Sequence, residues 1–286
     1  ERHDGQAVTC DDFIKAMEDA NGADLGQFKR WYSQAGTPRL AVSEHYDAEQ
    51  KTYSLTFAQS CPQTPDKVEK LPFVIPVELG LLNAQGAELP LPLAGESAAV
   101  GTSRVLSVTE AEQTFTFVGI NEKPLPSLLR GFSAPVKLQF AYSSDQLVFL
   151  MQHDTDGFNR WDAGQQLSVQ VLQTLIGQYQ RGETLVMDPR LVEALRSVLT
   201  NPQLDQAMVA EMLSLPGEAY LTEISEVADV DAIHAAREFA RKQLADSLFD
   251  ELWARYQANR EVSKVTPYVA CLLYTSDAAD ERSSVD

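Results

Sequence analysis

Hydrophobic and polar positions change their period twice along this chain, and the first change comes near residue 38. Before it, apolar residues recur at helical spacing, and one predicted helix has the apolar face Phe13, Ala16, Met17 and Ala20. Thr9 and Asp12 have the spacing of a capping box that begins this helix, and Asn21-Gly22 ends it. A second helix is predicted from about Asp24. The pair is too small to bury its apolar faces alone, so we expect residues 1–38 to be the end of a larger domain.

Residues 39–143 alternate between apolar and polar positions, which is typical of half-buried strands. Tyr53, Leu55 and Phe57, for example, alternate with threonines and a serine. Pro76 suggests an edge strand or a bulge, because proline cannot donate to a strand ladder. The expected strands are 40–46, 52–57, 73–82, 89–93, 105–108, 114–118 and 136–142. About seven short strands with turn signals between them predict an antiparallel β-sandwich.

The helical period returns from residue 144 and continues to about residue 270. Leu167, Val171, Leu175 and Tyr179 share one face at four-residue spacing. Asp188-Pro189 and Asn201-Pro202 each look like an N-cap followed by the first helical residue. A long last helix is predicted around a stripe from Ile233 to Tyr256. Successive helices with short turns predict a solenoid-like stack that is incomplete at its end.

Composition narrows the class of protein. The chain has 286 residues, of which 44% are hydrophobic and 22% charged, as in ordinary globular proteins. Its formal net charge of -18 argues against nucleic acid as a partner. No apolar run is long enough for a membrane span. Three distant cysteines do not form a disulfide framework, so we expect a reducing, cytoplasmic location.

Several segments in order carry a family resemblance. They are RHDGQAVTCDDFIKAME (Arg2 to Glu18) with Phe28, Trp31, Gln34, Gly36 and Pro38 after it, SAPVKLQF (Ser133 to Phe140) and FLMQHDTDGFNRWDA (Phe149 to Ala163). Together they resemble the bacterial aminopeptidase N family, alanyl aminopeptidases among the gluzincin zinc peptidases. The resemblance covers nearly all of residues 1–270.

The resemblance implies a particular multidomain α+β architecture. Residues 1–38 would be the C-terminal helices of a thermolysin-like catalytic domain, and residues 39–143 an immunoglobulin-like β-sandwich. Residues 144–270 would be a truncated α-helical repeat-like domain that covers the active site and restricts access to short peptides. In that family, a zinc-bound water attacks the peptide, a glutamate acts as general base and a tyrosine stabilises the oxyanion. All of those groups would precede Glu1.

The last sixteen residues form a separate case. The run CLLYTSDAADERSSVD, from Cys271 to Asp286, resembles a translated sequencing-library adapter. We expect residues 271–286 to be a non-native tail and leave them out of the fold prediction. A natural acidic tail is the alternative.

The sequence contains no recognisable zinc-peptidase motif. Such a motif needs two histidines one helical turn apart, H-E-x-x-H, with its glutamate as general base. The histidines are His3, His45, His153 and His234, and no two are close in sequence. The family's G-A-M-E-N signature is absent as well. We therefore assign no catalytic or metal-binding residue to this chain and expect it to bind no zinc.

Two groups of residues around histidines weakly resemble functional sites, one for a metal ion and one for acid–base chemistry. His234 with Glu238 one turn later and Asp231 three residues earlier could hold a divalent ion, although a solvated helix face explains them as well. His153 with Asp154 and Asp156 resembles a base with an orienting acid, although a loop or helix end is the simpler interpretation.

Cysteines and tryptophans offer further candidates. Cys10 and Cys61 could be reactive thiols, and Cys10 gains slightly from the adjacent helix N-terminus, but buried or idle cysteines explain both. Trp31, Trp161 and Trp253 are expected to be core residues or anchors of domain contacts.

Three functional hypotheses follow. In the first, the chain is the non-catalytic portion of a zinc aminopeptidase that acts on peptides, with zinc bound only by the complete protein. The second, from another class, is a non-enzymatic binding or scaffold module made of the sandwich and the helical stack. The third and weakest is a stand-alone hydrolase that uses His153 or His234.

Overall fold

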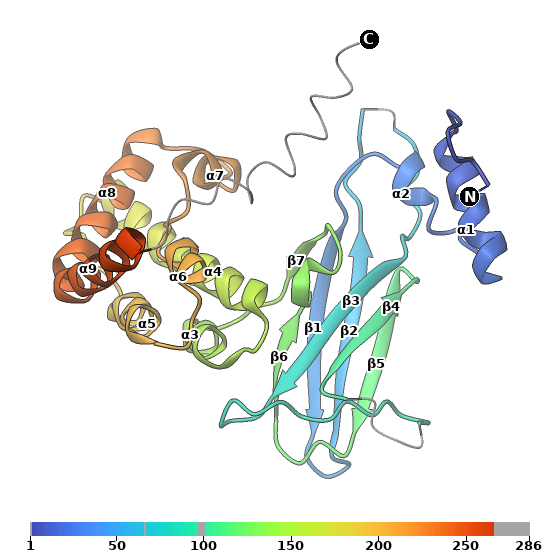
Figure 1. Cartoon of the computed structure of the whole chain (residues 1–286), viewed down its shortest axis with the longest axis horizontal. Helices are drawn as coiled ribbons and strands as arrows, with labels where there is room; N and C mark the ends of the chain where they lie inside the picture. Colours follow the sequence, from blue (N-terminus) through green and yellow to red (C-terminus); the bar gives the residue numbers. More distant parts are fainter. Residues whose placement is uncertain (1, 66, 97–100, 266–286) are drawn as a thin grey trace.

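The protein consists of two N-terminal helices, a β-sandwich and a helical domain. The computed structural model describes residues 2–65, 67–96 and 101–265. Helices α3 to α9 lie on one flank of the sandwich, and α1 and α2 lie on the other side (Figure 1). The segment predicted as a tail, Cys271–Asp286, lies outside the described residues.

The N-terminal helices are α1 (Cys10–Asn21) and α2 (Arg30–Ser33). The predicted capping box begins α1: the Thr9 hydroxyl accepts from the Asp12 N–H, and the Asp12 carboxylate accepts from the Thr9 N–H. Gly22 ends α1 with a φ of 61°, which glycine adopts without strain. The second helix is shorter than predicted because the Asp24 carboxylate binds the N–H of Gly26 in a local turn.

The sandwich contains two sheets. Its strands are β1 (Arg39–Asp47), β2 (Thr52–Ser60), β3 (Ile75–Leu82), β4 (Ser103–Val108), β5 (Glu112–Val118), β6 (Leu125–Leu128) and β7 (Lys137–Gln139). Within the described ranges one sheet has the order β5-β2-β1-β7 and the other β4-β3-β6. All pairs are antiparallel except β1 with β7, which is parallel. Buried side chains from both sheets form the core, including Phe57 of β2 and Phe117 of β5 from one sheet and Val77 and Leu79 of β3 from the other.

Two details of the sandwich differ from the sequence prediction. Leu125–Leu128 forms β6, although Pro124 precedes it and Pro126 interrupts it, because Pro126 lies in an edge strand that has β3 as its one neighbour among the described strands. The predicted strand 89–93 instead makes only isolated bridges, at Glu88 and Leu93, on either side of Pro90 and Pro92.

The prediction that Pro76 marks an edge strand or a bulge was wrong for β3 as a whole. β3 is the central strand of its sheet, not an edge. However, β6 pairs only with residues 79–82 of β3, so among the described strands the stretch around Pro76 has β4 as its single neighbour. Proline is therefore accommodated where one side of the strand is locally free.

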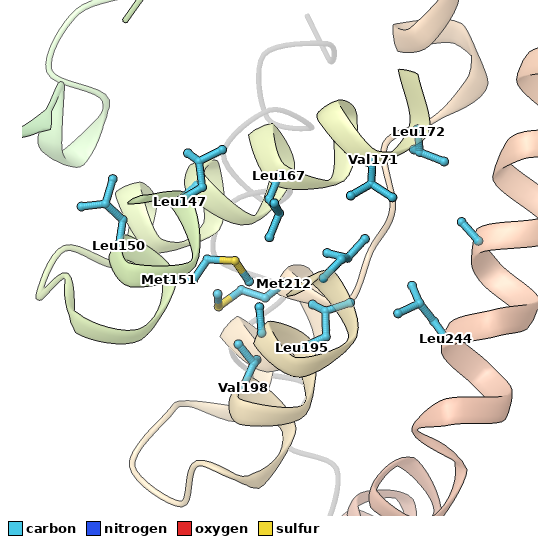
Figure 2. Close-up of a cluster of buried hydrophobic side chains, with 14 of the residues drawn as sticks. Leu147, Leu150, Met151, Leu167, Val171, Leu172, Leu195, Val198, Met212 and Leu244 are labelled. Atoms are coloured by element: carbon cyan, nitrogen blue, oxygen red, sulfur yellow. The ribbon is translucent and has the colours of Figure 1, made fainter. Parts of the chain in front are cut away.

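The helical domain packs successive helices around one core. Its helices are α3 (Ser144–His153), α4 (Gly157–Gln180), α5 (Pro189–Thr200), α6 (Gln206–Met212), α7 (Glu218–Glu223), α8 (Val230–Ser247) and α9 (Phe249–Val265). Figure 2 shows leucine, valine and methionine side chains from α3, α4, α5, α6 and α8 meeting in this core. The predicted fold class, a helical end-piece, an antiparallel sandwich and a helical stack, is confirmed.

Helix boundaries are partly as predicted. Asp188 caps α5 and Pro189 is its first residue, as expected. Asn201 instead ends α5, and α6 is capped by Asp205, whose carboxylate accepts from the N–H groups of Ala207 and Met208.

The predicted long last helix is in fact two helices. α8 and α9 are separated at Leu248, a residue held in the core. The longest described helix is α4, with 24 residues. Within the described part of the chain, no helix combines the length and apolar character that crossing a membrane requires.

Candidate functional site at the domain junction

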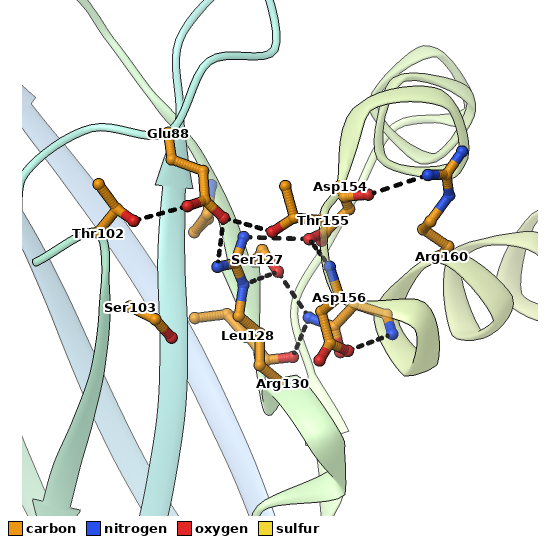
Figure 3. Close-up of polar contacts among 12 residues, drawn as sticks. Glu88, Thr102, Ser103, Ser127, Leu128, Arg130, Asp154, Thr155, Asp156 and Arg160 are labelled. Carbon is orange, nitrogen blue, oxygen red and sulfur yellow. Dashed lines mark hydrogen bonds and ion pairs between the residues drawn. The ribbon is translucent and has the colours of Figure 1, made fainter. Parts of the chain in front are cut away.

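The most elaborate polar site described in the molecule joins the sandwich to the helical domain. Arg130 lies at its centre, in the short helix η1 (Arg130–Phe132), with 4% of its side chain exposed. Its guanidinium donates to Glu88 at 2.7 Å, Asp154 at 3.0 Å and the Ser127 hydroxyl at 2.9 Å (Figure 3). Arginine suits this role because its planar fork can donate to several acceptors at once.

Local backbone geometry makes room for the Arg130 side chain. Gly80 of β3 faces the guanidinium so closely that an added Cβ would lie 2.3 Å from the Arg130 Cζ atom. Leu129, directly before Arg130, and Phe132, two residues after it, have positive φ angles of 57° and 52°. Non-glycine residues hold this conformation at a cost of about 1 kcal/mol or more, so the surrounding structure must impose it.

The helical domain supplies its part of the site from the connection between α3 and α4. Asp154, fully buried at the end of α3, accepts from Arg130 and from the N–H of Asp156. Asn159 of α4 donates from Nδ2 to the Ser127 hydroxyl at 2.7 Å and the Leu128 carbonyl at 3.0 Å. Asp156 accepts from the Gly131 N–H at 3.1 Å. Apart from the local Asp156–Asp154 bond, these bonds cross between the two domains and fix their relative orientation.

The two carboxylates around Arg130 have different electrostatics. Burial raises the pKa of Asp154, despite hydrogen bonds and the charge of Arg130 that act in the opposite direction. Burial would also raise the pKa of Glu88, but hydrogen bonds from Thr102, Thr155 and Arg130 outweigh it and lower that pKa. Burial thus acts on the pKa of both carboxylates but dominates only at Asp154.

Apolar contacts reinforce the same junction. Leu82, at the end of β3, belongs to the core of the helical domain, and Phe140 packs against both cores. The Tyr142 hydroxyl, at the end of the connection between the domains, donates to the Pro126 carbonyl at 2.8 Å. Polar and apolar contacts thus hold the helical domain in one position.

His153 does not act with its neighbouring acids. Its exposed ring packs against Phe149 at 4.5 Å between centroids, while Asp154 binds Arg130 and Asp156 caps α4. The helix-end interpretation of this group is therefore the one that the structure favours.

The His234 group does not converge either. The His234 Nδ1 atom lies 2.9 Å from the carboxylate of Glu218, and Glu238 instead pairs with Arg241. Among the described residues, no three His, Cys, Asp or Glu side chains gather closely enough to hold a metal ion. The donor set of the described chain therefore does not fit a catalytic zinc.

The remaining candidates occupy separate places. Cys10 is exposed, and Cys61 is partly buried beside the Ala35 carbonyl. Trp31 anchors the N-terminal helices on the sandwich, and Trp161 packs partly buried against the helical core. Trp253 is 52% exposed and stacks on Tyr256, so it is not a core residue of the described structure, and its role as a contact anchor stays a prediction.

Sequence reasoning missed the junction residues Glu88, Arg130 and Asn159. They lie far apart in sequence and meet only through the packing of two domains. One signal was present: Gly80 interrupts the apolar run of β3, and glycine inside a strand often marks a close approach by another group.

Comparison with known protein families shows which kinds of domain the chain contains. Residues 36–141 match a family model described as a domain of unknown function (DUF3458) with an Ig-like fold. Residues 144–282 match a second one, described as a domain of unknown function (DUF3458_C) with ARM repeats. The chain is therefore an immunoglobulin-like domain joined to an armadillo-type helical domain. The second match extends to residue 282, so the foreign origin of Cys271–Asp286 stays a prediction.

Curated relatives identify the family. The chain is 42% identical to aminopeptidase N of Escherichia coli K12, over 96% of this chain and 32% of that protein. It is 43% identical to aminopeptidase N of Haemophilus influenzae, over 89% of this chain and 29% of that protein. Among solved structures, the crystal structure of Legionella pneumophila aminopeptidase A in complex with aspartic acid matches at 30% identity and a TM-score of 0.71. That match covers 88% of this chain and 27% of the other.

The chain belongs to the aminopeptidase N family. It spans about a third of the length of the curated relatives that it matches.

Proposed function

We propose that this chain is the non-catalytic portion, C-terminal to the zinc site, of a zinc-dependent aminopeptidase that removes N-terminal residues from peptides. The observation that carries the proposal is the identity of 38–43% to aminopeptidase N proteins over most of this chain. Zinc would be held by the complete protein, because the described residues offer no suitable group of ligands. The chemistry is therefore assigned outside this chain.

An exposed apolar face on the N-terminal helices supports this assignment. Phe13 and Met17 of α1 and the neighbouring Phe28 and Tyr32 are between 36% and 57% exposed, and Ile14 is the only described buried residue of α1. Phe13 and Met17 lie one turn apart on α1, and the rings of Phe28 and Tyr32 lie 6.3 Å apart. Exposed apolar groups of this kind commonly mark a contact with another structure. In our proposal this face packs against the catalytic domain of the same enzyme.

The sandwich and helical domain would act as a spacer and as a cover that restricts access to the active site. A cover can discriminate between substrates only if its position is defined. The Arg130 site and the shared apolar contacts define the position of this cover, because they fix the helical domain on the sandwich. Peptides would be the substrates, and the free thiols of Cys10 and Cys61 fit a cytoplasmic location.

Assays of residues 1–286 alone test the proposal that zinc binding and catalysis lie outside this chain. We expect no release from an aminoacyl-anilide and no stoichiometric zinc by metal analysis, with the complete E. coli relative as positive control. One equivalent of tightly bound zinc, together with activity that a His234→Ala variant loses, would overturn the proposal.

The covering role needs the complete enzyme. Removing the segment from Ser144 onward should raise kcat/KM for long peptides relative to a dipeptide-sized anilide. Equal changes for long and short substrates would argue against an access role. The second candidate, a non-enzymatic binding or scaffold module, predicts that the upstream gene sequence lacks an H-E-x-x-H helix.

A further inference from the structure

A pocket in the helical domain is separate from the domain junction. It has a volume of about 540 Å³ and lies between α4, α7 and the connection that joins α6 to α7. Volumes of this size are typical of sites for small organic ligands. The lining residues used below are Trp161, Asp162, Gln166, Glu211, Leu215 and Tyr220.

Asp162 gives this pocket an acidic wall without a basic partner. Its carboxylate accepts a hydrogen bond from the Gln166 side chain at 2.7 Å, and no described Lys, Arg or His forms an ion pair with it. Arg237 of α8 donates from its Nε to the carbonyl of Pro216, which also lines the pocket, at 2.9 Å, and it forms no ion pair with Asp162 among the described contacts. Burial raises the pKa of Asp162, so a charged Asp162 in this place would gain from a cation.

The other walls are suited to an organic ion. Glu211 adds a second carboxylate, which forms no ion pair with another described residue. Trp161 and Tyr220 add aromatic rings, and Tyr220 is 51% exposed. Aromatic rings attract cations through their faces and also cover apolar stems. Leu215 contributes an apolar surface between them.

A bare metal ion fits this pocket poorly. Among the described residues, Asp162 and Glu211 are the only acids that line it, and no group of three metal-ligating side chains occurs there. Two carboxylates beside aromatic and aliphatic walls match a cation that carries its own apolar part. The charge would lie near Asp162 and the stem against the rings.

We propose that this pocket binds an organic cation, an ammonium or guanidinium group on an alkyl stem such as a lysine or arginine side chain. Asp162 and Glu211 receive the charge, and Trp161, Leu215 and Tyr220 contact the stem. The proposal concerns binding by this chain and does not depend on peptidase activity.

Binding can be measured on the 286-residue chain with three probes. They are Nα-acetyl-lysine amide, its uncharged analogue Nα-acetyl-norleucine amide, and 1,5-diaminopentane. We expect the lysine derivative to shift the indole N–H signal of Trp161 in NMR spectra, while Trp31 and Trp253, which do not line the pocket, stay unchanged. The norleucine derivative should bind at least about tenfold more weakly, since a desolvated charge contact contributes of the order of 1.4 kcal/mol or more. If 1,5-diaminopentane binds as tightly as the lysine derivative, an alkylamine without the amide groups is sufficient for binding.

Variants locate the site. Asp162→Asn should weaken lysine binding by tenfold or more, whereas Asp246→Asn, the same charge change at an exposed position of α8, should leave it unchanged. Glu211→Gln and Tyr220→Ala, at exposed positions that should not affect folding, should each weaken it severalfold even if Asp162→Asn does not fold. Equal affinity for the norleucine derivative, or unchanged affinity in Glu211→Gln and Tyr220→Ala, would overturn the proposal.

Discussion

The sandwich has two junctions, and they are built by different physical means. On one side the helical domain is joined through a buried cation with two carboxylates, in addition to shared apolar contacts. On the other side, the N-terminal helices are joined mainly by side chains that donate to backbone carbonyls of the sandwich. Figure 1 shows the two attachments on different sides of the strands.

The hydrogen bonds of the N-terminal junction are less deeply buried than those around Arg130. Trp31 donates from its indole to the Val74 carbonyl at 2.8 Å, and its ring lies 4.6 Å from that of Phe73. Gln27 donates to the Thr109 carbonyl at 2.7 Å. These donors are only partly buried, so water can replace part of each lost bond.

The difference shows which attachment tolerates change. Loss of a partly buried neutral hydrogen bond costs about 1 kcal/mol, whereas loss of one member of a buried charged group leaves an uncompensated charge. The helical domain should therefore be fixed on the sandwich more firmly than α1 and α2 are. Four measurements, in order of expected effect, test this comparison.

Replacing the central cation should have the largest effect. Arg130→Met leaves Glu88 and Asp154 without their shared partner, and Asp154 is fully buried. We expect a loss of about 3–5 kcal/mol in the free energy of unfolding, measured by urea denaturation. Arg181→Met, which removes an exposed pair with Glu183, serves as the control and should unfold at the urea concentration of the wild type. Equal curves for both variants would contradict the central role of Arg130.

Filling the space at Gly80 should have the next largest effect. The added Cβ of Gly80→Ala would collide with the Arg130 guanidinium, so we expect a loss of about 1–3 kcal/mol in unfolding free energy. In the background of Arg130→Met the same change should cost less, because the colliding group is gone. Gly217→Ala, where no atom lies within 4 Å of the added Cβ, is the control. Strictly additive effects of the two substitutions would argue against this contact.

The N-terminal junction should respond more weakly. Trp31→Phe keeps a ring against Phe73 but loses the hydrogen bond to Val74, so we expect a loss of about 1 kcal/mol. Limited proteolysis should then cleave near residue 38 faster than in the wild type, while the junction at Arg130 stays resistant. Trp253→Phe, at an exposed position, should change neither result. Faster cleavage near residue 144 would reverse the order of the two junctions.

The smallest effect concerns pH. Because burial raises the pKa of Asp154, the folded protein binds a proton there more tightly than the unfolded chain does. The contribution of Asp154 to stability should therefore fall as pH rises from 3.8, its ordinary value, through the raised pKa. In a plot of unfolding free energy against pH, Asp154→Asn should lack this fall, even if the substitution also lowers stability equally at every pH. An unchanged slope would show that Asp154 does not titrate in this way.

Much of the architecture could be predicted from the sequence because it depends on local patterns. The change from helical to alternating period and back predicted the succession of domains, since each period matches one kind of element. The caps of α1 and α5 were found as well, at Thr9 with Asp12 and at Asp188 with Pro189. These signals depend on residues within one or two turns of each other.

Other features could not be predicted because they depend on neighbours distant in sequence. The pattern alone did not show that β6 would stop short of Pro76, or that Leu248 would divide the last predicted helix. No spacing connects Glu88, Arg130 and Asn159, which meet only because two domains pack together. The sequence by itself determined the succession of helical, strand-rich and helical regions. Only the tertiary structure decided which polar groups share a buried space, because burial makes their pairing obligatory.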